Sequence, residues 1–291
     1  MKKGRIIKLI GGQYTVKDEQ GKNSVVKPLG VFRHQEIDPK VGDIVTYDDN
    51  SIVAVDERVN ALIRPPIANV DQAILIHSAK SPAFSFFLLD RFLTLVEHEN
   101  ITPVIIVTKI DLMSESALEE LKQTMQYYAQ FYQVYFTSVH QAKSLEIMKA
   151  LLVDKVSVFA GQTGSGKSSL LNAIDVNLSI KTGEISKALG RGKHTTRHTE
   201  LLEVHGGLVA DTPGFSKLDF YDMEVEDLLH CYPDFSVLSE TCKFRMCLHI
   251  NEPGCSVKKA VESGAILPQR YENYRLIHEE IKAQKKIYRK K

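Results

Sequence analysis

The first 63 residues alternate short hydrophobic runs with turn-forming residues. Each run is three to five residues long and carries the β-branched and aromatic residues typical of strands, and Gly, Asn or Asp residues separate the runs. The runs lie at residues 5–9, 13–16, 24–26, 43–47 and 52–55. Short strands at such close spacing are typical of a small closed barrel. The pattern therefore predicts an OB-like β-barrel, with an SH3-like barrel as the alternative, over residues 1–63.

A different pattern follows, in which fully hydrophobic runs alternate with helix-length segments. The runs lie at residues 73–76, 104–107, 134–136 and 156–159. Strands without a polar face belong to parallel sheets that helices cover on both sides. We expect an α/β domain over residues 64–221.

The rest of the chain is helical in character and contains all four cysteines. These are Cys231, Cys242, Cys247 and Cys255, and a basic, helix-forming stretch closes the sequence at residues 269–291. Cysteines gathered within 25 residues favour a metal site over disulfides in a reducing compartment. We predict a helical, metal-binding third domain over residues 222–291.

Composition narrows the classes of protein that fit. The chain has 291 residues, of which 43% are hydrophobic and 25% charged, and these proportions exclude a disordered, collagenous or coiled-coil protein. No apolar run approaches the ~18 residues of a membrane helix, so we expect a cytoplasmic protein without a membrane partner. The net charge of +1 conceals local asymmetry, because residues 1–30 hold seven basic and two acidic residues.

A phosphate-binding loop follows the fourth hydrophobic run. Residues 161–168 read Gly-Gln-Thr-Gly-Ser-Gly-Lys-Ser, which fits G-x-x-x-x-G-K-[ST] between a strand and a helix. Its glycines let backbone N–H groups converge on phosphate oxygens. Lys167 can reach the β- and γ-phosphates, and the Ser168 hydroxyl can bind Mg²⁺.

Two further segments resemble the base-binding elements of GTPases. Thr108, Lys109 and Asp111 follow the run at 104–107 and resemble the Asn-Lys-x-Asp box. The Asp111 carboxylate can accept from both N1–H and the 2-amino group of guanine, and adenine offers neither donor. Thr108 stands where the pattern has Asn, which puts one hydrogen bond in question. Thr137 and Ser138 resemble the loop whose backbone contacts guanine O6; alone, either segment would pass for an ordinary surface turn.

The remaining phosphate elements lie further along the chain. Asp211 and Gly214 belong to Asp-Thr-Pro-Gly, which fits D-x-x-G. Asp211 is predicted to contact a Mg²⁺-bound water, and the Gly214 N–H is predicted to contact the γ-phosphate. Thr195 or Thr196 stands where a GTPase keeps the switch threonine that closes on Mg²⁺. The predicted GTP-binding residues are Thr108, Lys109, Asp111, Thr137, Ser138, Gly161, Gln162, Thr163, Gly164, Ser165, Gly166, Lys167, Ser168, Ser169, Thr195, Thr196, Asp211 and Gly214, with magnesium at Ser168, Thr195, Thr196 and Asp211.

The order of these motifs differs from that of an ordinary GTPase. The base elements at 108–111 and 137–138 precede the phosphate elements at 161–168 and 211–214, whereas the usual order is the reverse. Cutting the fold once and joining its old ends gives this order while keeping every contact, and domain termini often lie close enough to permit it. We predict a circularly permuted P-loop GTPase domain.

Together with the barrel, the Gly-Arg-Gly-Lys-His-Thr-Thr segment at 190–196 and the cysteine cluster, this order resembles the RsgA family, also called YjeQ or YloQ, over the whole chain. The resemblance implies a GTPase that binds GTP and GDP, the small (30S) ribosomal subunit and its 16S rRNA. It further implies a role late in subunit maturation, with slow GTP hydrolysis that the subunit stimulates. A monomer is the default expectation.

The catalytic residue is expected near the switches. Phe215 follows Gly214 where Ras-like proteins place the Gln that orients the attacking water, so slow intrinsic hydrolysis is expected. His194 is the nearest side chain able to replace that Gln, and the resemblance also nominates it. The alternative is that His194 is a solvated or RNA-binding residue among Arg191, Lys193 and Arg197.

Cys242, Cys247, His249 and Cys255 supply three thiolates and one imidazole. This donor set suits one closed, structural Zn²⁺ site, while buried free cysteines are the alternative. Cys231 has no counterpart in the family cluster and is predicted to be a buried, unliganded residue.

Basic segments suggest RNA binding, although each taken alone could be a solvated surface. They lie at residues 1–30, 191–197 and 282–291. Tyr14, Phe32 and Tyr47 of the barrel fit either base stacking or core packing. Two other functions remain open at this point: a non-catalytic RNA scaffold and an ATP-using P-loop enzyme.

Overall fold

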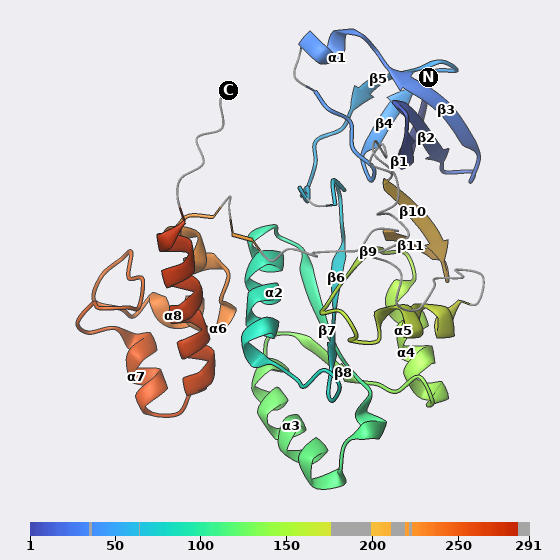
Figure 1. Ribbon diagram of the computed structural model, residues 1–291. Helices are drawn as coiled ribbons and strands as arrows, with labels where there is room; N and C mark the ends of the chain where they lie inside the picture. The colour runs from blue at the N-terminus through green and yellow to red at the C-terminus, as the bar shows by residue number, and fades with distance from the viewer. Residues whose placement is uncertain (35–36, 64, 176–198, 211–218, 221–222, 285–291) are drawn as a thin grey trace.

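The computed structural model describes residues 1–34, 37–63, 65–175, 199–210, 219–220 and 223–284. It contains a β-barrel, a mostly parallel sheet with helices on both faces, and a helical C-terminal module (Figure 1). The predicted fold class of barrel, permuted α/β domain and helical Cys/His module is confirmed.

Five strands form the N-terminal barrel. They are β1 (Lys2–Ile10), β2 (Gln13–Asp18), β3 (Asn23–Pro28), β4 (Ile44–Tyr47) and β5 (Ser51–Val55), and a short α1 (Val31–His34) follows β3. The strand order is β2-β3-β5-β4-β1, and pairing of β1 with β2 closes the barrel. Tyr14, Phe32 and Tyr47 are buried in its core, so packing and not base stacking explains these aromatic residues.

The second sheet has the order β10-β11-β9-β6-β7-β8. Its strands are β6 (Gln72–Ser78), β7 (Thr102–Thr108), β8 (Gln133–Phe136), β9 (Val156–Ala160), β10 (Thr199–Val204) and β11 (Gly207–Ala210). All neighbouring pairs are parallel except the β10–β11 hairpin. Every residue of β6 and β9 is buried, as their largely hydrophobic sequence predicts, and the few polar residues of these strands are buried with the rest.

Helices cover both faces of this sheet. They are α2 (Phe86–His98), the short 3₁₀ helix η1 (Ile110–Leu112), α3 (Glu115–Tyr128), α4 (Ala142–Leu152) and α5 (Lys167–Ile174). Alternate residues of β6 enter two separate cores. Leu75 joins the α2 side, whereas Ile74 and Ile76 join the α4 and α5 side. Hydrophobic residues on both faces of one strand therefore hold the two helical layers on the sheet.

The barrel and the sheet are joined through backbone pairing. Strand β1 pairs antiparallel with β10, with Lys8 opposite Glu200 and Leu9 opposite Thr199. An ion pair of 3.0 Å between the Lys8 Nζ and a Glu200 carboxylate oxygen accompanies this pairing. The two sheets thus form one eleven-stranded arrangement.

The C-terminal module packs on the outer side of α2. It contains the 3₁₀ helix η3 (Val225–His230), α6 (Pro233–Ser239), α7 (Ser256–Glu262) and α8 (Pro268–Ala283). Helix α2 lies between the sheet and α8 (Figure 1). The predicted C-terminal helix over 269–291 corresponds to α8, and residues 285–291 lie outside the described part of the chain.

A fully buried arginine connects α8 to α2 and α6. Arg270 Nη1 donates to an Asp90 oxygen at 2.5 Å, and its Nε and Nη2 donate to Asp234 at 3.0 Å. Asn273 donates to the other Asp90 oxygen, and the Tyr232 ring lies under the guanidinium. Two carboxylates satisfy one buried guanidinium, and this pairing offsets the cost of removing the three charges from water.

Candidate nucleotide site and metal centre

The phosphate loop connects β9 to α5. Gly161, Gly164 and Gly166 have φ values of +151°, +81° and +96°, which favour glycine. A Cβ on Gly161 would lie 2.3 Å from the Ile76 carbonyl oxygen, so a side chain does not fit there. The loop therefore closes tightly over the end of β6 and leads directly into the first turn of α5.

Lys167 begins α5 and turns back toward the loop. Its Nζ donates to the Gly161 carbonyl at 3.0 Å, and burial lowers the pKa of the amine from its ordinary value. Ser168 follows it in the first turn of the helix. The arrangement can offer an ammonium group, a hydroxyl and backbone N–H groups to phosphate oxygens and to a magnesium ion.

A pocket of about 210 Å³ lies beside this loop. Residues from three separate parts of the sequence line it: Thr108, Lys109, Asp111, Leu112, Thr137, Val139, His140, Gly166, Ser169 and Leu170. They meet because β7, β8 and β9 are in one parallel array and their carboxyl ends lie at the same edge. The predicted base elements and the phosphate loop are thus brought together around one pocket.

Thr108 ties the base-binding segment to the phosphate loop. Its hydroxyl donates to the Ser165 carbonyl at 2.5 Å and lies 3.3 Å from the His77 carbonyl oxygen. The side chain is 4% exposed, so its hydroxyl serves the protein interior. A threonine can therefore join the two loops at this position without a carboxamide.

Lys109 makes a second connection. Its Nζ donates to the Gly164 carbonyl at 2.6 Å and to the Ser81 carbonyl. The residue has a left-handed φ of +57°, which turns the chain from β7 into η1 and leaves Asp111 exposed at the pocket. An exposed carboxylate at this rim can accept two hydrogen bonds from the edge of a base.

Sequence motifs did not indicate all of the lining. Leu112, Val139, His140 and Leu170 line the pocket but belong to no nucleotide motif, and Ser81 contacts Lys109 from the loop after β6. His140 lies only two residues beyond Ser138, so proximity to the base loop was the one available signal.

Several predicted residues lie outside the described residues. They are His194, Thr195, Thr196, Asp211 and Gly214. The strands next to them are described: β10 begins at Thr199, and β11 ends at Ala210 beside β9. Because β11 and β9 are parallel neighbours, the chain leaves β11 at the edge from which the phosphate loop starts.

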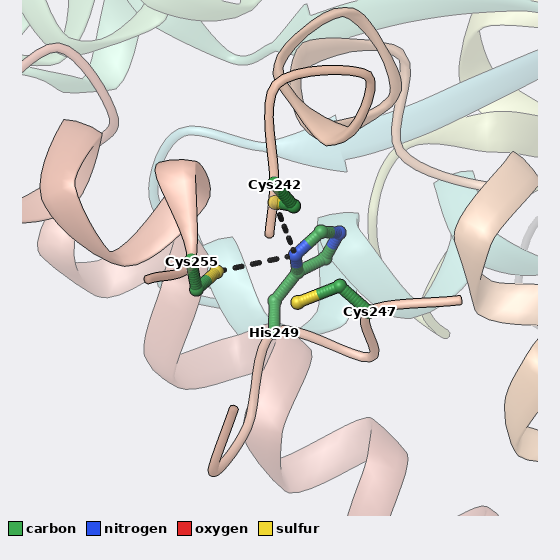
Figure 2. Close-up of side chains that lie close together, drawn as sticks. All are labelled: Cys242, Cys247, His249 and Cys255. Atoms are coloured by element: carbon green, nitrogen blue, oxygen red, sulfur yellow. Dashed lines mark hydrogen bonds between the residues drawn. The ribbon is translucent and has the colours of Figure 1, made fainter. Parts of the chain in front are cut away.

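The four predicted metal ligands come together (Figure 2). One donor atom from each of Cys242, Cys247, His249 and Cys255 lies within 4.8 Å of the others. His249 Nδ1 is 3.7 Å from Cys242 Sγ and 3.3 Å from Cys255 Sγ. Three sulfurs and one imidazole nitrogen at this spacing fit a single tetrahedral metal with no open position for substrate.

Hydrogen bonds orient the loops of the cluster. Glu252 accepts from the backbone N–H groups of Leu248 and Ile250 at 2.8 and 2.9 Å. The hydroxyls of Tyr271 and Tyr274 on α8 donate to the carbonyls of His249 and Leu248, both at 2.7 Å. The cluster is thus attached to α8 by contacts that do not involve the donor atoms.

Cys231 lies apart from the cluster. Its Sγ donates to the Asp227 carbonyl at 3.3 Å, and burial raises the pKa of this thiol to about 12. A buried, protonated thiol is a poor ligand, which agrees with its predicted structural role.

No helix within the described ranges is long and apolar enough to cross a membrane.

The phosphate loop, the base pocket and their order along the chain define a circularly permuted P-loop GTPase. Family models match in two parts, with the RsgA GTPase at residues 55–221 and the RsgA N-terminal domain at residues 3–52. The chain belongs to the RsgA family, and it is a GTPase, a hydrolase acting on GTP.

Curated relatives match along almost the entire chain. "Small ribosomal subunit biogenesis GTPase RsgA" of Bacillus cytotoxicus is 50% identical over 99% of this chain and 100% of its own. The Geobacillus sp. (strain WCH70) protein of the same name is 52% identical with the same coverage. The YloQ crystal structure, titled a circularly permuted GTPase, matches with a TM-score of 0.83 and 43% identity, over 99% of this chain and 97% of that one. The crystal structure of YjeQ from Thermotoga maritima matches with a TM-score of 0.86 and 36% identity, over 98% of this chain and 99% of that one.

Proposed function

We propose that this GTPase binds the small (30S) ribosomal subunit through its 16S rRNA and assists a late step of subunit maturation. Intrinsic GTP hydrolysis is slow, and the subunit stimulates it. The observation that carries the proposal is the end-to-end match, at 50% identity, to proteins named for small-subunit biogenesis. The base pocket joined to a phosphate loop supports GTP as the nucleotide.

The pocket residues have complementary tasks in the proposal. Asp111 accepts from guanine N1–H and the 2-amino group, and the Lys109 stem packs along the base. Thr108 acts by tying the loops together through its bond to the Ser165 carbonyl. Thr137 and Ser138 supply the backbone contact to O6. This division of tasks explains how the site functions without the usual Asn.

The phosphate side holds GTP and Mg²⁺. Residues 161–169 surround the phosphates, and Lys167 neutralises charge on the β- and γ-phosphates. Ser168 and either Thr195 or Thr196 would hold Mg²⁺, Asp211 would hold it through a bound water, and Gly214 would contact the γ-phosphate. When bound, Mg²⁺ neutralises charge that develops on the phosphate oxygens.

His194 is the proposed catalytic residue. It stands beside the switch threonines in the sequence, while Phe215 occupies the usual place of the water-orienting Gln. An imidazole can accept a hydrogen bond from the attacking water and so orient it. Docking on the subunit fixes His194 for hydrolysis, and hydrolysis then releases the switch and the factor from the subunit.

Zinc is the proposed metal of the Cys242, Cys247, His249 and Cys255 cluster, because soft thiolates with one imidazole in a closed site suit it. Its role is structural.

The proposed domain division of the chain is residues 1–63, 64–221 and 222–291.

The segment between the first two metal ligands supports RNA binding. Lys243, Phe244, Arg245 and Met246 are all exposed, with Phe244 at 44% and Met246 at 63%. The metal ligands Cys242 and Cys247 anchor both ends of this zinc loop. Basic side chains that flank an exposed aromatic ring can contact phosphates while an unpaired base stacks on the ring.

The experiment measures GTP hydrolysis with and without purified small subunits, with large subunits and ATP as controls. We expect strong stimulation that is specific to GTP and to small subunits. His194→Ala is expected to lower the stimulated rate about 100-fold or more, whereas the neighbouring Lys193→Ala retains most of it. A hydrolysis rate that small subunits do not raise would favour the non-catalytic RNA scaffold. Competition of ATP with GTP for the site would favour the ATP-using enzyme.

A further inference from the structure

A short segment, residues 79–84, connects β6 to α2 and lies beside the nucleotide site. Pro82 of this segment contacts the phosphate loop, because a Cβ built on Gly164 would lie 3.5 Å from the Pro82 Cδ. The backbone of the segment contacts the base-binding residues, since the Lys109 Nζ donates to the Ser81 carbonyl. The segment thus contacts both halves of the site, although it belongs to no nucleotide motif.

The Lys109 ammonium joins this segment to the phosphate loop. Its Nζ donates to the Ser81 carbonyl and, at 2.6 Å, to the Gly164 carbonyl. Hydrogen bonds from a charged donor are stronger than those between neutral groups, so the two carbonyls together determine where the ammonium lies. Lys109 also lines the base pocket next to Gly166. The position of the Ser81 carbonyl therefore affects a residue of the pocket wall.

Ser78 restrains the segment where it leaves the sheet. It is the last residue of β6, lies opposite Thr108 of β7, and is only 3% exposed. Its hydroxyl donates to the Lys80 carbonyl at 2.6 Å. This bond restrains the chain one residue before Ser81, whose carbonyl Lys109 contacts.

Packing and a helix cap fix the other end of the segment. The centre of the Phe84 ring lies 5.6 Å from that of the buried His77 ring. Ser85 caps α2, because its hydroxyl accepts from the Leu88 N–H at 3.2 Å. The segment is therefore held at α2 independently of Ser78, and the Ser78 hydroxyl restrains the end at β6.

We propose that residues 78–82 are a third component of the nucleotide site and that Ser78 is a positioning residue for the binding of GTP and GDP. Ser78 holds the Lys80 carbonyl and thereby the position of Ser81. The Ser81 carbonyl in turn holds the Lys109 ammonium beside the pocket. Groups that are already in place before the ligand arrives bind it more tightly, because less freedom is lost on binding. The inference rests on the nucleotide site of the proposed function and not on its ribosomal role.

The test measures GDP affinity, with a fluorescent GDP analogue, and GTP hydrolysis without ribosomal subunits in Ser78→Ala. We expect GDP affinity to fall about 3- to 10-fold and the KM for GTP to rise by a similar factor, because one positioning hydrogen bond is lost. The kcat is expected to stay unchanged, since the effect is on binding.

Ser157→Ala is the matched control. Ser157 is also a fully buried serine of this sheet, and its hydroxyl accepts from the Gln72 Nε2 at 2.9 Å, at the opposite end of β6 from Ser78. This control is expected to match wild type in GDP affinity, KM and kcat. A loss of GDP affinity in Ser157→Ala as large as that in Ser78→Ala would overturn the proposal.

A double-mutant cycle with Lys109→Met shows whether Ser78 acts through Lys109. Met keeps an apolar stem but has no ammonium to be positioned. Ser78→Ala is therefore expected to weaken GDP binding in the wild-type background and to have no further effect in Lys109→Met. An equal loss in both backgrounds would overturn the proposal, because it would indicate general damage.

Two other results would also overturn it: wild-type GDP affinity in Ser78→Ala, or a lower kcat with unchanged KM. GDP binding by the wild-type protein tests the nucleotide site itself, so failure of that site is distinguished from failure of this inference.

Discussion

Thr108 performs its task in the nucleotide site by a bond to the protein backbone. Its hydroxyl donates to the Ser165 carbonyl, and Lys109 donates to the Gly164 carbonyl, so two neighbouring side chains connect the base segment to the phosphate loop. Asp111 is left free to face the pocket. The side chains that attach the two loops are thus distinct from the carboxylate that we propose selects the base.

Asp111→Asn is expected to exchange guanine for xanthine specificity. The Asn amide N–H₂ would face the guanine 2-amino group, donor against donor, whereas it can donate to the 2-oxo group of xanthine. We expect affinity for GDP to fall about 100-fold or more and affinity for XDP to rise. Titration with fluorescent nucleotide analogues measures both, and Asp154→Asn, on an exposed turn, is the control. Unchanged GDP affinity would contradict the role of Asp111.

His77 adds a pH dependence to stability. It is 3% exposed between the rings of Phe84 and Phe92, and burial lowers its pKa to about 4. Since the unfolded chain has the higher pKa of 6.5, it binds the proton first, and stability is lost as pH falls from 6.5 towards 4.

Urea unfolding at pH 7 and pH 5 tests this effect. Between pH 7 and pH 5, the free energy of unfolding is expected to fall by about 2 kcal/mol more in wild type than in His77→Gln, because Gln does not titrate. His98→Gln is the control, since His98 lies in the last turn of α2 and is only half-buried. Equal losses in wild type and His77→Gln would contradict the buried neutral state of His77.

At the element scale, the metal cluster organises loops with little regular structure. Among the described elements, α6 precedes the cluster in the chain and the short α7 follows it, and Tyr271 and Tyr274 attach the loops of the cluster to α8. A small element with so little regular structure is expected to depend on its metal for a defined fold.

Metal removal is expected to unfold the cluster loops first. Protein purified without chelator should contain about one zinc per chain, and Cys247→Ser should contain much less. Protease cleavage near residues 243–254 should then become faster, while nucleotide binding by the core persists. Cys231→Ser is the control and should retain its metal. Full metal content in Cys247→Ser would contradict the proposed ligand set.

In the whole molecule, specific contacts join the barrel, the GTPase core and the C-terminal module. The barrel pairs with β10 of the second sheet, and α8 is connected to α2 through Arg270 and Arg91. The loop of residues 243–246 belongs to the C-terminal module, and its basic and apolar side chains are exposed. Binding at this loop would therefore act on a module that is directly joined to the GTPase core.

Two substitutions in the zinc loop separate its two proposed contacts. Phe244→Ala should weaken binding to small subunits about tenfold without changing the dependence on salt, because stacking is not ionic. Arg245→Ala should reduce the slope of log affinity against log salt by about one. Affinity is measured by cosedimentation over a series of salt concentrations, with Val237→Ala as an exposed apolar control. Wild-type behaviour in both variants would exclude this loop from the RNA interface.

Elements whose signal is local could be predicted from the amino-acid sequence. Short runs of strand-forming residues between turn-forming residues identified the barrel, and hydrophobic runs without a polar face identified the buried strands. The phosphate loop, the base box and the set of metal ligands likewise each lie within one short segment of the sequence. Their order was enough to predict the circular permutation, which the fold confirms.

The contacts between these elements could not be predicted from the sequence, because they join residues that are far apart along the chain. Thr108 contacts a residue 57 positions away, Arg270 contacts one 180 positions away, and Arg91 joins Glu280 across 189 positions. Such contacts cannot be seen in the periodicity of the sequence, because the residues around an Asp, Glu or Arg in a helix do not show whether its side chain is paired or exposed. Chain topology brings these groups together, and burial then makes their pairing necessary.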